Sequence, residues 1–414
     1  VSAFTIETAN DVTLQAITTN DAGTISIGSS GTKLAGTLTL NGDLASQTTA
    51  NNNAGDIALH AANIKVDANP NGNITIDAND DDTASSAADG TITISTSGSL
   101  SSNTAFEDGL ALHSGNDATD VSSATLTDLN ALDITASAVT IGATTTGSGG
   151  ISLTSTVGDI TIGGNLSTDG SGNAGNVSFS PSGNIVISSD VEIDTDSALN
   201  NDADITLAGV QGSGSARSIT LTAGSGDINL SATANTNISD FTATGDLITI
   251  GGAIDAEGIV SLTSSADNAD SDAKIDVNAA ISAAQIELSG VSNTEVPVID
   301  IAAVALTTDG DTASSTGQII LQSNGTLAIN GSTTFVGAAS GTQEVVIRPE
   351  ANSNTIRIGT AGSSSDLDID LDSISGVQTT IEQISIGFSD QSGLTTINHG
   401  SAITGIPVDL QVYG

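Results

Sequence analysis

The stretch that decides the fold is residues 149–188, which read GGISLTSTVGDITIGGNLSTDGSGNAGNVSFSPSGNIVIS. Four short segments within it have apolar residues at positions i and i+2, the period of a strand with one buried face. These expected strands are Ile151–Leu153, Ile160–Ile162, Val177–Phe179 and Ile185–Ile187. Glycine, Asp and Asn residues lie between them and favour turns, because Gly accepts positive φ and Asx side chains bond nearby backbone. The stretch therefore predicts short β-strands joined by turns, and no helices.

The same unit of a glycine, a polar residue and an apolar-x-apolar strand recurs along the whole chain, as at Gly55–Leu59 and Gly226–Leu230. Close pairs of strands are separated by longer gaps, which indicates coils of about 18 to 28 residues with two or three strands each. Short strands repeated over the 414 residues predict an all-β fold, a parallel β-helix (β-solenoid) that forms a rod. An array of β-sandwich modules is the alternative.

The supply of large side chains favours thin buried layers over a globular core. The chain has six Phe, one Tyr and no Trp or Met, and it has no Cys for a disulfide framework. We expect solenoid coils over residues 1–340 and a continuation of the solenoid over residues 341–414. The second segment holds two of the six basic residues and the rarer Pro349, Pro407 and Tyr413, so we interpret it as differentiated terminal coils or an assembly end.

The net charge of −42, from 48 acidic and 6 basic residues, excludes several classes of partner. Nucleic acid and anionic membranes would be repelled, and aromatic residues for base stacking are scarce. No apolar run approaches the roughly 18 residues of a membrane helix. We therefore expect no nucleic-acid partner and no membrane insertion, but an affinity for cations. Asp rows on neighbouring coils should be staggered or shielded by cations, because like charges directly opposite destabilise a sheet.

Two acidic segments are candidate calcium sites, because hard cations prefer carboxylate oxygens. One is a run of three aspartates, and the other alternates Asp with Leu or Ile, so that four carboxylates share one face of a strand. The candidate metal ligands are Asp80, Asp81, Asp82, Asp366, Asp368, Asp370 and Asp372. The alternative interpretation is a solvated loop and a solvated strand face in an acidic protein. Calcium is the one cofactor that the sequence suggests, and none is required.

The sequence does not predict an enzyme. His60, His113 and His399 are isolated and form no zinc motif, and no G-x-S-x-G nucleophile motif lies at a strand-to-helix turn. An enzyme that cleaves acidic polysaccharides would need a cationic cleft, which six scattered basic residues do not predict. A β-helix enzyme that acts on neutral glycans through paired carboxylates remains the enzymatic alternative, with no particular pair indicated.

Runs such as GDITIGGNLSTDGSGNAGNVSFS, residues 158–180, resemble the repeat regions of filamentous-haemagglutinin-like, two-partner-secreted exoproteins and related giant β-strand-repeat surface proteins of bacteria. The resemblance implies a right-handed β-helical rod, export to the cell surface, and a role in adhesion or extracellular structure. The secretion domain of that family carries NPNL and NPNG turns. Here only Asn69–Gly72 has the second motif, without an upstream NPNL.

These observations predict an extracellular structural protein, a rod-like segment of a bacterial surface fibre, filament or adhesin at the cell surface. Its main expected partner is itself, through head-to-tail stacking or covalent continuation of the solenoid. Cell-surface glycans are the expected partners of an adhesin. A calcium-dependent surface-layer protein is the alternative function.

Overall fold

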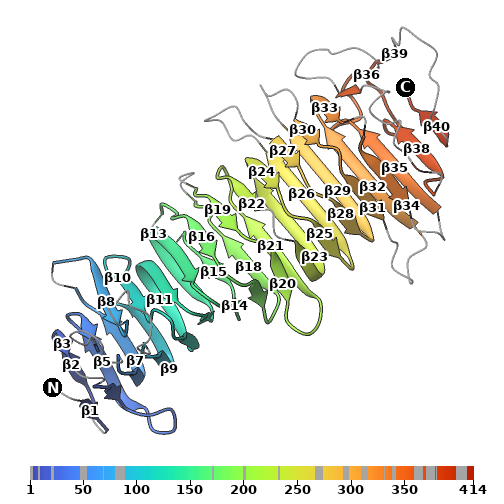
Figure 1. The fold of residues 1–414 in the computed structure, drawn as a ribbon. Coiled ribbons are helices and arrows are strands. Elements are labelled where there is room, and N and C mark those ends of the chain that lie inside the picture. The colour runs from blue at the N-terminus through green and yellow to red at the C-terminus, as the bar shows by residue number, and fades with distance from the viewer. Residues whose placement is uncertain are drawn as a thin grey trace. The chain divides into compact units, whose positions relative to one another are not determined.

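The computed structural model divides into two compact units, Val1–Ala208 (unit 1) and Gly209–Gly414 (unit 2), each considered by itself below (Figure 1). The structure describes residues 3–7, 10–19, 23–46, 54–68, 70–79, 89–169, 172–198, 202–231, 234–265, 274–291, 298–308, 316–330, 332–337, 342–358, 367–369, 378, 380–397 and 408–414. Within these residues all regular structure is β-strand, and every strand pairing with a given register is parallel. The predicted parallel β-helix is therefore confirmed. The β-sandwich alternative was wrong, since sandwich sheets are antiparallel.

Unit 1 is built from three rows of parallel strands, and the chain passes through the rows in turn to complete each coil. The first row contains β1 (Phe4–Ile6), β4 (Ile25–Ile27), the starts of β7 (Ile57–Val66), β9 (Ile92–Ser102) and β11 (Thr119–Ala136), then β12 (Val139–Ile141), β14 (Ile160–Ile162) and β17 (Ile185–Ile187). The second row contains β2 (Val12–Leu14), β5 (Leu34–Leu40), later parts of β7, β9 and β11, the start of β13 (Thr144–Ser155), β15 (Leu166–Ser167) and β18 (Val191–Asp194). The third row contains β3 (Ile17–Thr18), β6 (Leu44–Ala45), β8 (Asn73–Asp77), β10 (Gly109–His113), the ends of β11 and β13, β16 (Val177–Ser180) and β19 (Ile205–Leu207).

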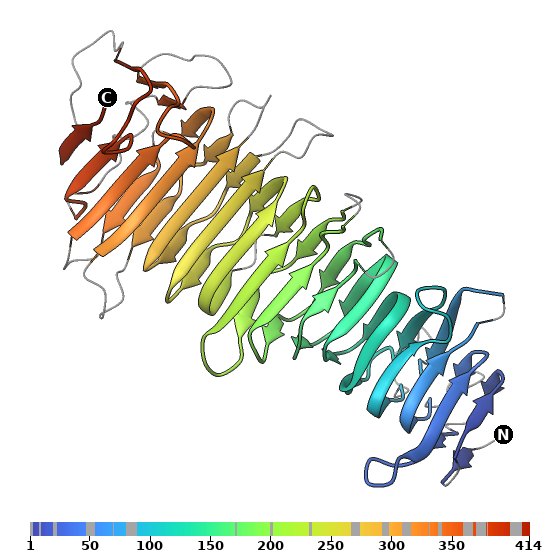
Figure 2. The same ribbon diagram turned by 180° about the vertical axis from the view of Figure 1, so that it is seen from behind.

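Unit 2 has the same three-row plan, and Figure 2 shows its stacked strands from behind. One row contains β20 (Val210–Gly212), the start of β23 (Asn235–Gly245), β25 (Ile254–Ala256), β28 (Ile281–Ala283), β31 (Ala305–Thr308) and β34 (Thr334–Gly337). Another contains β21 (Arg217–Thr222), the rest of β23, β26 (Ile259–Ser265), β29 (Gln285–Val291), β32 (Thr316–Ser323), β35 (Thr342–Arg348), β38 (Gln383–Ile386) and β40 (Asp409–Val412). The last contains β22 (Ile228–Leu230), β24 (Leu247–Ile250), β27 (Lys274–Val277), β30 (Ile299–Ile301), β33 (Thr326–Ile329), β37 (Leu367–Ile369), β36 (Ile356–Ile358) and β39 (Thr395–Ile397).

The last row of unit 2 departs from the order of the chain. Strand β37 follows β36 in the sequence, yet it pairs with β33 on one side and with β36 on the other. Strand β36 then pairs with β39. In the stack, β37 therefore lies between β33 and β36, although it comes after both of them in the sequence.

The interior of each unit is a set of stacked apolar side chains. Inward residues at equivalent positions of neighbouring coils lie directly over one another, as Ile160 does over Ile185, and both are fully buried. Ile, Leu and Val make up most of the buried apolar residues, while Phe241 and Phe335 are the largest fully buried side chains. The expected thin layers of aliphatic side chains are thus present, and outward positions carry mainly small polar residues.

Buried hydroxyl groups close several of the turns between rows. Thr19 Oγ1 donates a hydrogen bond of 2.5 Å to the Gly23 carbonyl, and Ser114 Oγ donates one of 2.8 Å to the Asp117 carbonyl. Both side chains are fully buried, so the bonds satisfy carbonyl groups that a turn would otherwise leave without a partner. Among the described residues, no helix has the length and apolar character needed to cross a membrane.

Replacing Phe241 by Ala should destabilise unit 2 by about 3 to 5 kcal/mol, because the ring is fully buried and its loss leaves a cavity. Phe241 lies between Ile219 and Val260 of the neighbouring coils, which cannot both move inward to fill the space. Denaturant unfolding followed by circular dichroism measures the loss. The outward neighbour Thr242→Ala is the matched control, and an equal loss in both variants would contradict the assigned register.

Candidate functional site

One kind of side-chain hydrogen bond from one coil to the next recurs in unit 1 and is found once among the described residues of unit 2. In it an Asp or Asn directly precedes an inward apolar residue, and its Oδ1 accepts a hydrogen bond from the backbone N–H of the register-equivalent residue in a neighbouring coil. We call these residues the Asx ladder. Its members are Asp11, Asp43, Asp56, Asn63, Asp159, Asn165, Asn176 and Asp240, with N to Oδ1 distances from 2.8 to 3.2 Å.

Glycine makes room for the ladder. The residue before the receiving N–H is Gly36 opposite Asp11, Gly183 opposite Asp159 and Gly258 opposite Asp240. A Cβ at any of these glycines would overlap the accepting Oδ1. At these three positions one coil therefore supplies the acceptor and the next coil supplies the space, whereas Ile74, Val191 and Ala203 precede the receiving N–H groups opposite Asp43, Asn165 and Asn176.

Both Asp and Asn serve in the ladder because the bond needs only an acceptor oxygen. An ionised carboxylate makes the stronger bond to an N–H group. The carboxylates of the ladder therefore contribute to the negative charge of the chain and also stabilise the contacts between its coils. They are those of Asp11, Asp43, Asp56, Asp159 and Asp240.

Most of the predicted calcium ligands cannot be placed. Asp80, Asp81, Asp82, Asp366, Asp370 and Asp372 lie outside the described residues. Asp368 is described and is buried in β37, with 3% of its surface exposed, so it does not belong to a solvated strand face. Its register partners are Arg357 in β36 and Thr326 in β33. The described residues contain no group of three or more His, Asp or Glu side chains arranged to hold a metal ion.

A group of aspartates near the end of unit 1 is electrostatically unfavourable. Burial raises the pKa of Asp194, and the charge of Asp169 adds to this effect, although a hydrogen bond from the Asp196 N–H opposes it. Burial also raises the pKa of Asp196, followed by the charges of Asp202 and Asp169. These carboxyl groups resist full ionisation more than isolated aspartates do.

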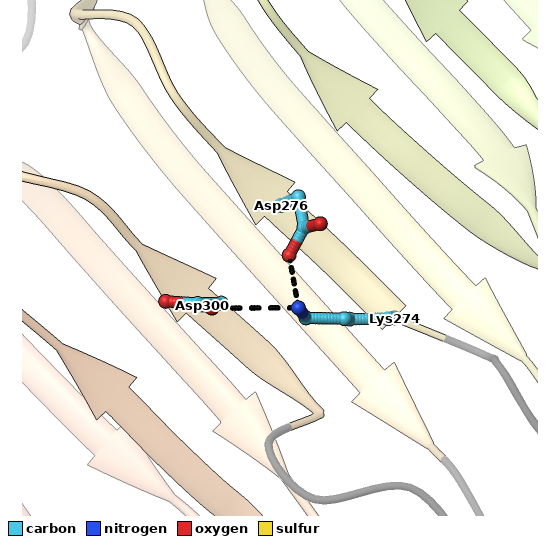
Figure 3. Close-up of polar contacts among 3 residues, drawn as sticks. All are labelled: Lys274, Asp276 and Asp300. Carbon is cyan, nitrogen blue, oxygen red and sulfur yellow. Dashed lines mark hydrogen bonds and ion pairs between the residues drawn. The ribbon is translucent and has the colours of Figure 1, made fainter.

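On the outer surface of unit 2, a lysine shields two stacked aspartates (Figure 3). Asp276 and Asp300 are register partners on β27 and β30. Lys274 Nζ lies 2.6 Å from Asp276 Oδ1 and 3.4 Å from Asp300 Oδ2. Partial burial acts to lower the pKa of Lys274, but the two carboxylates outweigh it and raise that pKa. The expectation that stacked aspartates are shielded by a cation is met here by a side chain of the protein.

His60 has a specific partner, unlike the isolated residue that the sequence suggested. It is buried in β7, and its Nδ1 lies 2.6 Å from Ser95 Oγ in the next coil. Burial lowers the pKa of His60, and the positive charge of Lys33 lowers it further. Lys33 donates a 2.7 Å hydrogen bond from Nζ to the Thr96 carbonyl, beside Ser95. His113 lies on β10, whereas His399 is outside the described residues.

Comparisons with known proteins gave no relatives. No family model matches the chain, and no curated protein or solved structure matches it either. The resemblance to filamentous-haemagglutinin-like exoproteins therefore stays a prediction from the sequence.

Replacing Asp159 by Ala should weaken the bond between two coils of unit 1, because it leaves the Asn184 N–H without its acceptor. We expect a loss of about 1 to 3 kcal/mol, and a much smaller loss for Asp159→Asn, which keeps an acceptor oxygen. Hydrogen exchange of residues 183–187 gives a local measurement. Asp133→Ala is the control, since the Asp133 side chain points outward from β11 and forms no hydrogen bond with another described residue. Equal protection in Asp159→Ala and Asp133→Ala would count against the ladder.

The contribution of His60 to the stability of unit 1 should decrease as the pH falls below 6.5, the ordinary pKa of histidine. The folded state lowers the pKa of His60, so the unfolded chain binds a proton that the folded chain resists. This contribution is complete above pH 6.5 and decreases as the pH falls toward the folded-state pKa. NMR titration of the His60 ring measures that pKa. Lys33→Gln should raise it, and a wild-type value at or above 6.5 would refute the assignment.

Proposed function

We propose that this chain is an extracellular structural protein, a rod-like segment of a bacterial surface fibre, filament or adhesin. The observation that supports this proposal best is the Asx ladder, which among the described residues joins neighbouring coils at seven places in unit 1 and at Asp240 in unit 2. Polar side chains at these positions serve cohesion between coils. In a solenoid each coil contacts only its neighbours, so bonds between neighbouring coils add directly to the stability of the stack.

The expected partner is the protein itself. A parallel solenoid coil presents backbone N–H and C=O groups along the stacking direction, and each coil contacts only its neighbours. Further coils, from the same chain or from another copy, extend the stack by the same ladder chemistry. Contacts of this kind are heterologous, so they produce filaments and need not close into rings.

Export to the cell surface is part of the proposal. The sequence offers trypsin-like proteases only six basic residues in 414, of which Lys274 is held by two carboxylates. The net charge of −42 keeps filaments soluble and repels nucleic acid. We propose no catalytic activity and no required cofactor for this chain.

A calcium-dependent surface-layer protein is the second candidate, and one observation favours it. Burial and the charges of neighbouring acidic side chains, Asp169 among them, raise the pKa of both Asp194 and Asp196, and a divalent cation from the medium would relieve that repulsion. Cation dependence of assembly separates this candidate from a filament that needs only contacts between coils.

Electron microscopy of the purified chain, with and without a calcium chelator, tests the proposal. We expect long uniform filaments that persist in chelator, because the described bonds between coils need no metal ion. Filaments that dissolve in chelator and return with calcium would favour the surface-layer candidate. Short single particles under both conditions would contradict self-assembly, and release of sugar from a neutral polysaccharide would favour the glycan-active enzyme.

A further inference from the structure

A polar groove lies on the outer surface of unit 1, beside β1 and β4. Its volume is about 390 Å³, and it is lined by Thr5, Glu7, Ser26, Gly28, Ser29 and Thr32. This volume is within the range of roughly 300 to 1,000 Å³ that is usual for small-molecule sites. Nothing in the Asx ladder or in the interior of the unit uses these side chains.

The floor of the groove is formed by two strands in register. Thr5 of β1 and Ser26 of β4 are register partners, and both alternate with inward residues, so their hydroxyl groups point outward. Glu7 follows β1 directly, and its side chain is exposed. The carboxylate has no hydrogen bond or ion pair with any other described residue.

The wall of the groove is a short turn that is held from several sides. Ser29 and Thr32 exchange two backbone hydrogen bonds of 3.0 and 3.1 Å, and Ser29 Oγ accepts a third, of 2.9 Å, from the Thr32 N–H. Gly28 has a φ of 66°, and a Cβ there would overlap the His60 carbonyl, so only glycine lets the chain turn outward at this point. Lys33, which follows Thr32 in the chain, donates a hydrogen bond from Nζ to the Thr96 carbonyl. The groove is therefore preformed.

The lining selects the class of ligand. It contains no basic residue, so it does not favour anions. A single carboxylate supplies too few oxygen ligands of the kind that calcium takes. Serine and threonine hydroxyls both donate and accept, whereas the carboxylate accepts strong hydrogen bonds from hydroxyl donors. This combination suits a ligand with several neighbouring hydroxyl groups.

We propose that this groove binds a neutral saccharide, with Glu7 accepting hydrogen bonds from two adjacent sugar hydroxyls. The remaining sugar hydroxyls form hydrogen bonds with the hydroxyl groups of Thr5, Ser26, Ser29 and Thr32. The inference goes beyond the proposed structural role and does not depend on it. The lining holds no aromatic ring for a sugar to stack on, so each individual contact is weak.

Titration of the ¹⁵N-labelled full chain with methyl glycosides of glucose, galactose, mannose and N-acetylglucosamine tests the proposal by NMR. At least one of the four should shift the amide signals of Glu7, Gly28, Ser29 and Thr32. Glu7→Gln should weaken that binding about tenfold, since it removes a charged acceptor. Glu257→Gln is the matched control, because Glu257 is an exposed carboxylate in unit 2.

Two results would overturn the saccharide site. One is the absence of shifts around the groove with all four glycosides, and the other is equal binding by Glu7→Gln and Glu257→Gln. Electron microscopy of Glu7→Gln keeps the two proposals separate. Filaments made by a variant with weakened sugar binding would support the groove as a site distinct from assembly, whereas joint loss of both would contradict that separation.

Discussion

Backbone pairing between successive coils is the interaction on which everything else in this protein depends. The strands are short, often three residues, and none would be stable alone. Each gains its partners from the coils on either side, so the interior stacks and the outward rows follow from one register. The Asx ladder acts at the same level, because Asp159 and Asn176 add a side-chain bond to the backbone bonds at the start of a strand.

Negative charge at repeated positions destabilises such a fold, because like charges then lie opposite one another on neighbouring strands. Residues that face outward on one coil lie beside their equivalents on the next, so carboxylates are brought together wherever the pattern repeats an acid. Carboxylates brought together in this way are found in three arrangements. The ladder carboxylates accept N–H bonds, Lys274 bridges Asp276 and Asp300, and Asp194 and Asp196 have raised pKa values. In the first two arrangements the carboxylates form stabilising contacts between coils, whereas in the third the repulsion between carboxylates remains.

The sequence predicted the class of fold because its signal is local and repeated. The alternation in Ile160–Ile162 and Ile185–Ile187 gave the strands and their inward faces directly. The ladder could have been predicted from the recurrence of Gly-Asx-Ile, but its meaning depends on register, which needs the neighbouring coil. The pairing of His60 with Ser95 joins residues 35 apart in the chain, and no short motif indicates it. The interchange of β36 and β37 could not be foreseen either, since Ile356–Ile358 has the same apolar-x-apolar pattern as strands that stack in chain order, such as Ile160–Ile162.

That interchange has a consequence for how unit 2 yields to a pulling force. In a solenoid whose strands stack in chain order, tension from one side peels the coils away one at a time, each exposed by the loss of the one before. Here β37 comes later in the chain than β36, but it is held between β33 and β36. Tension transmitted from the C-terminal side reaches β37 first, while β36 still covers it. We therefore expect both strands to separate together, so that this crossing resists unfolding from the C-terminal side.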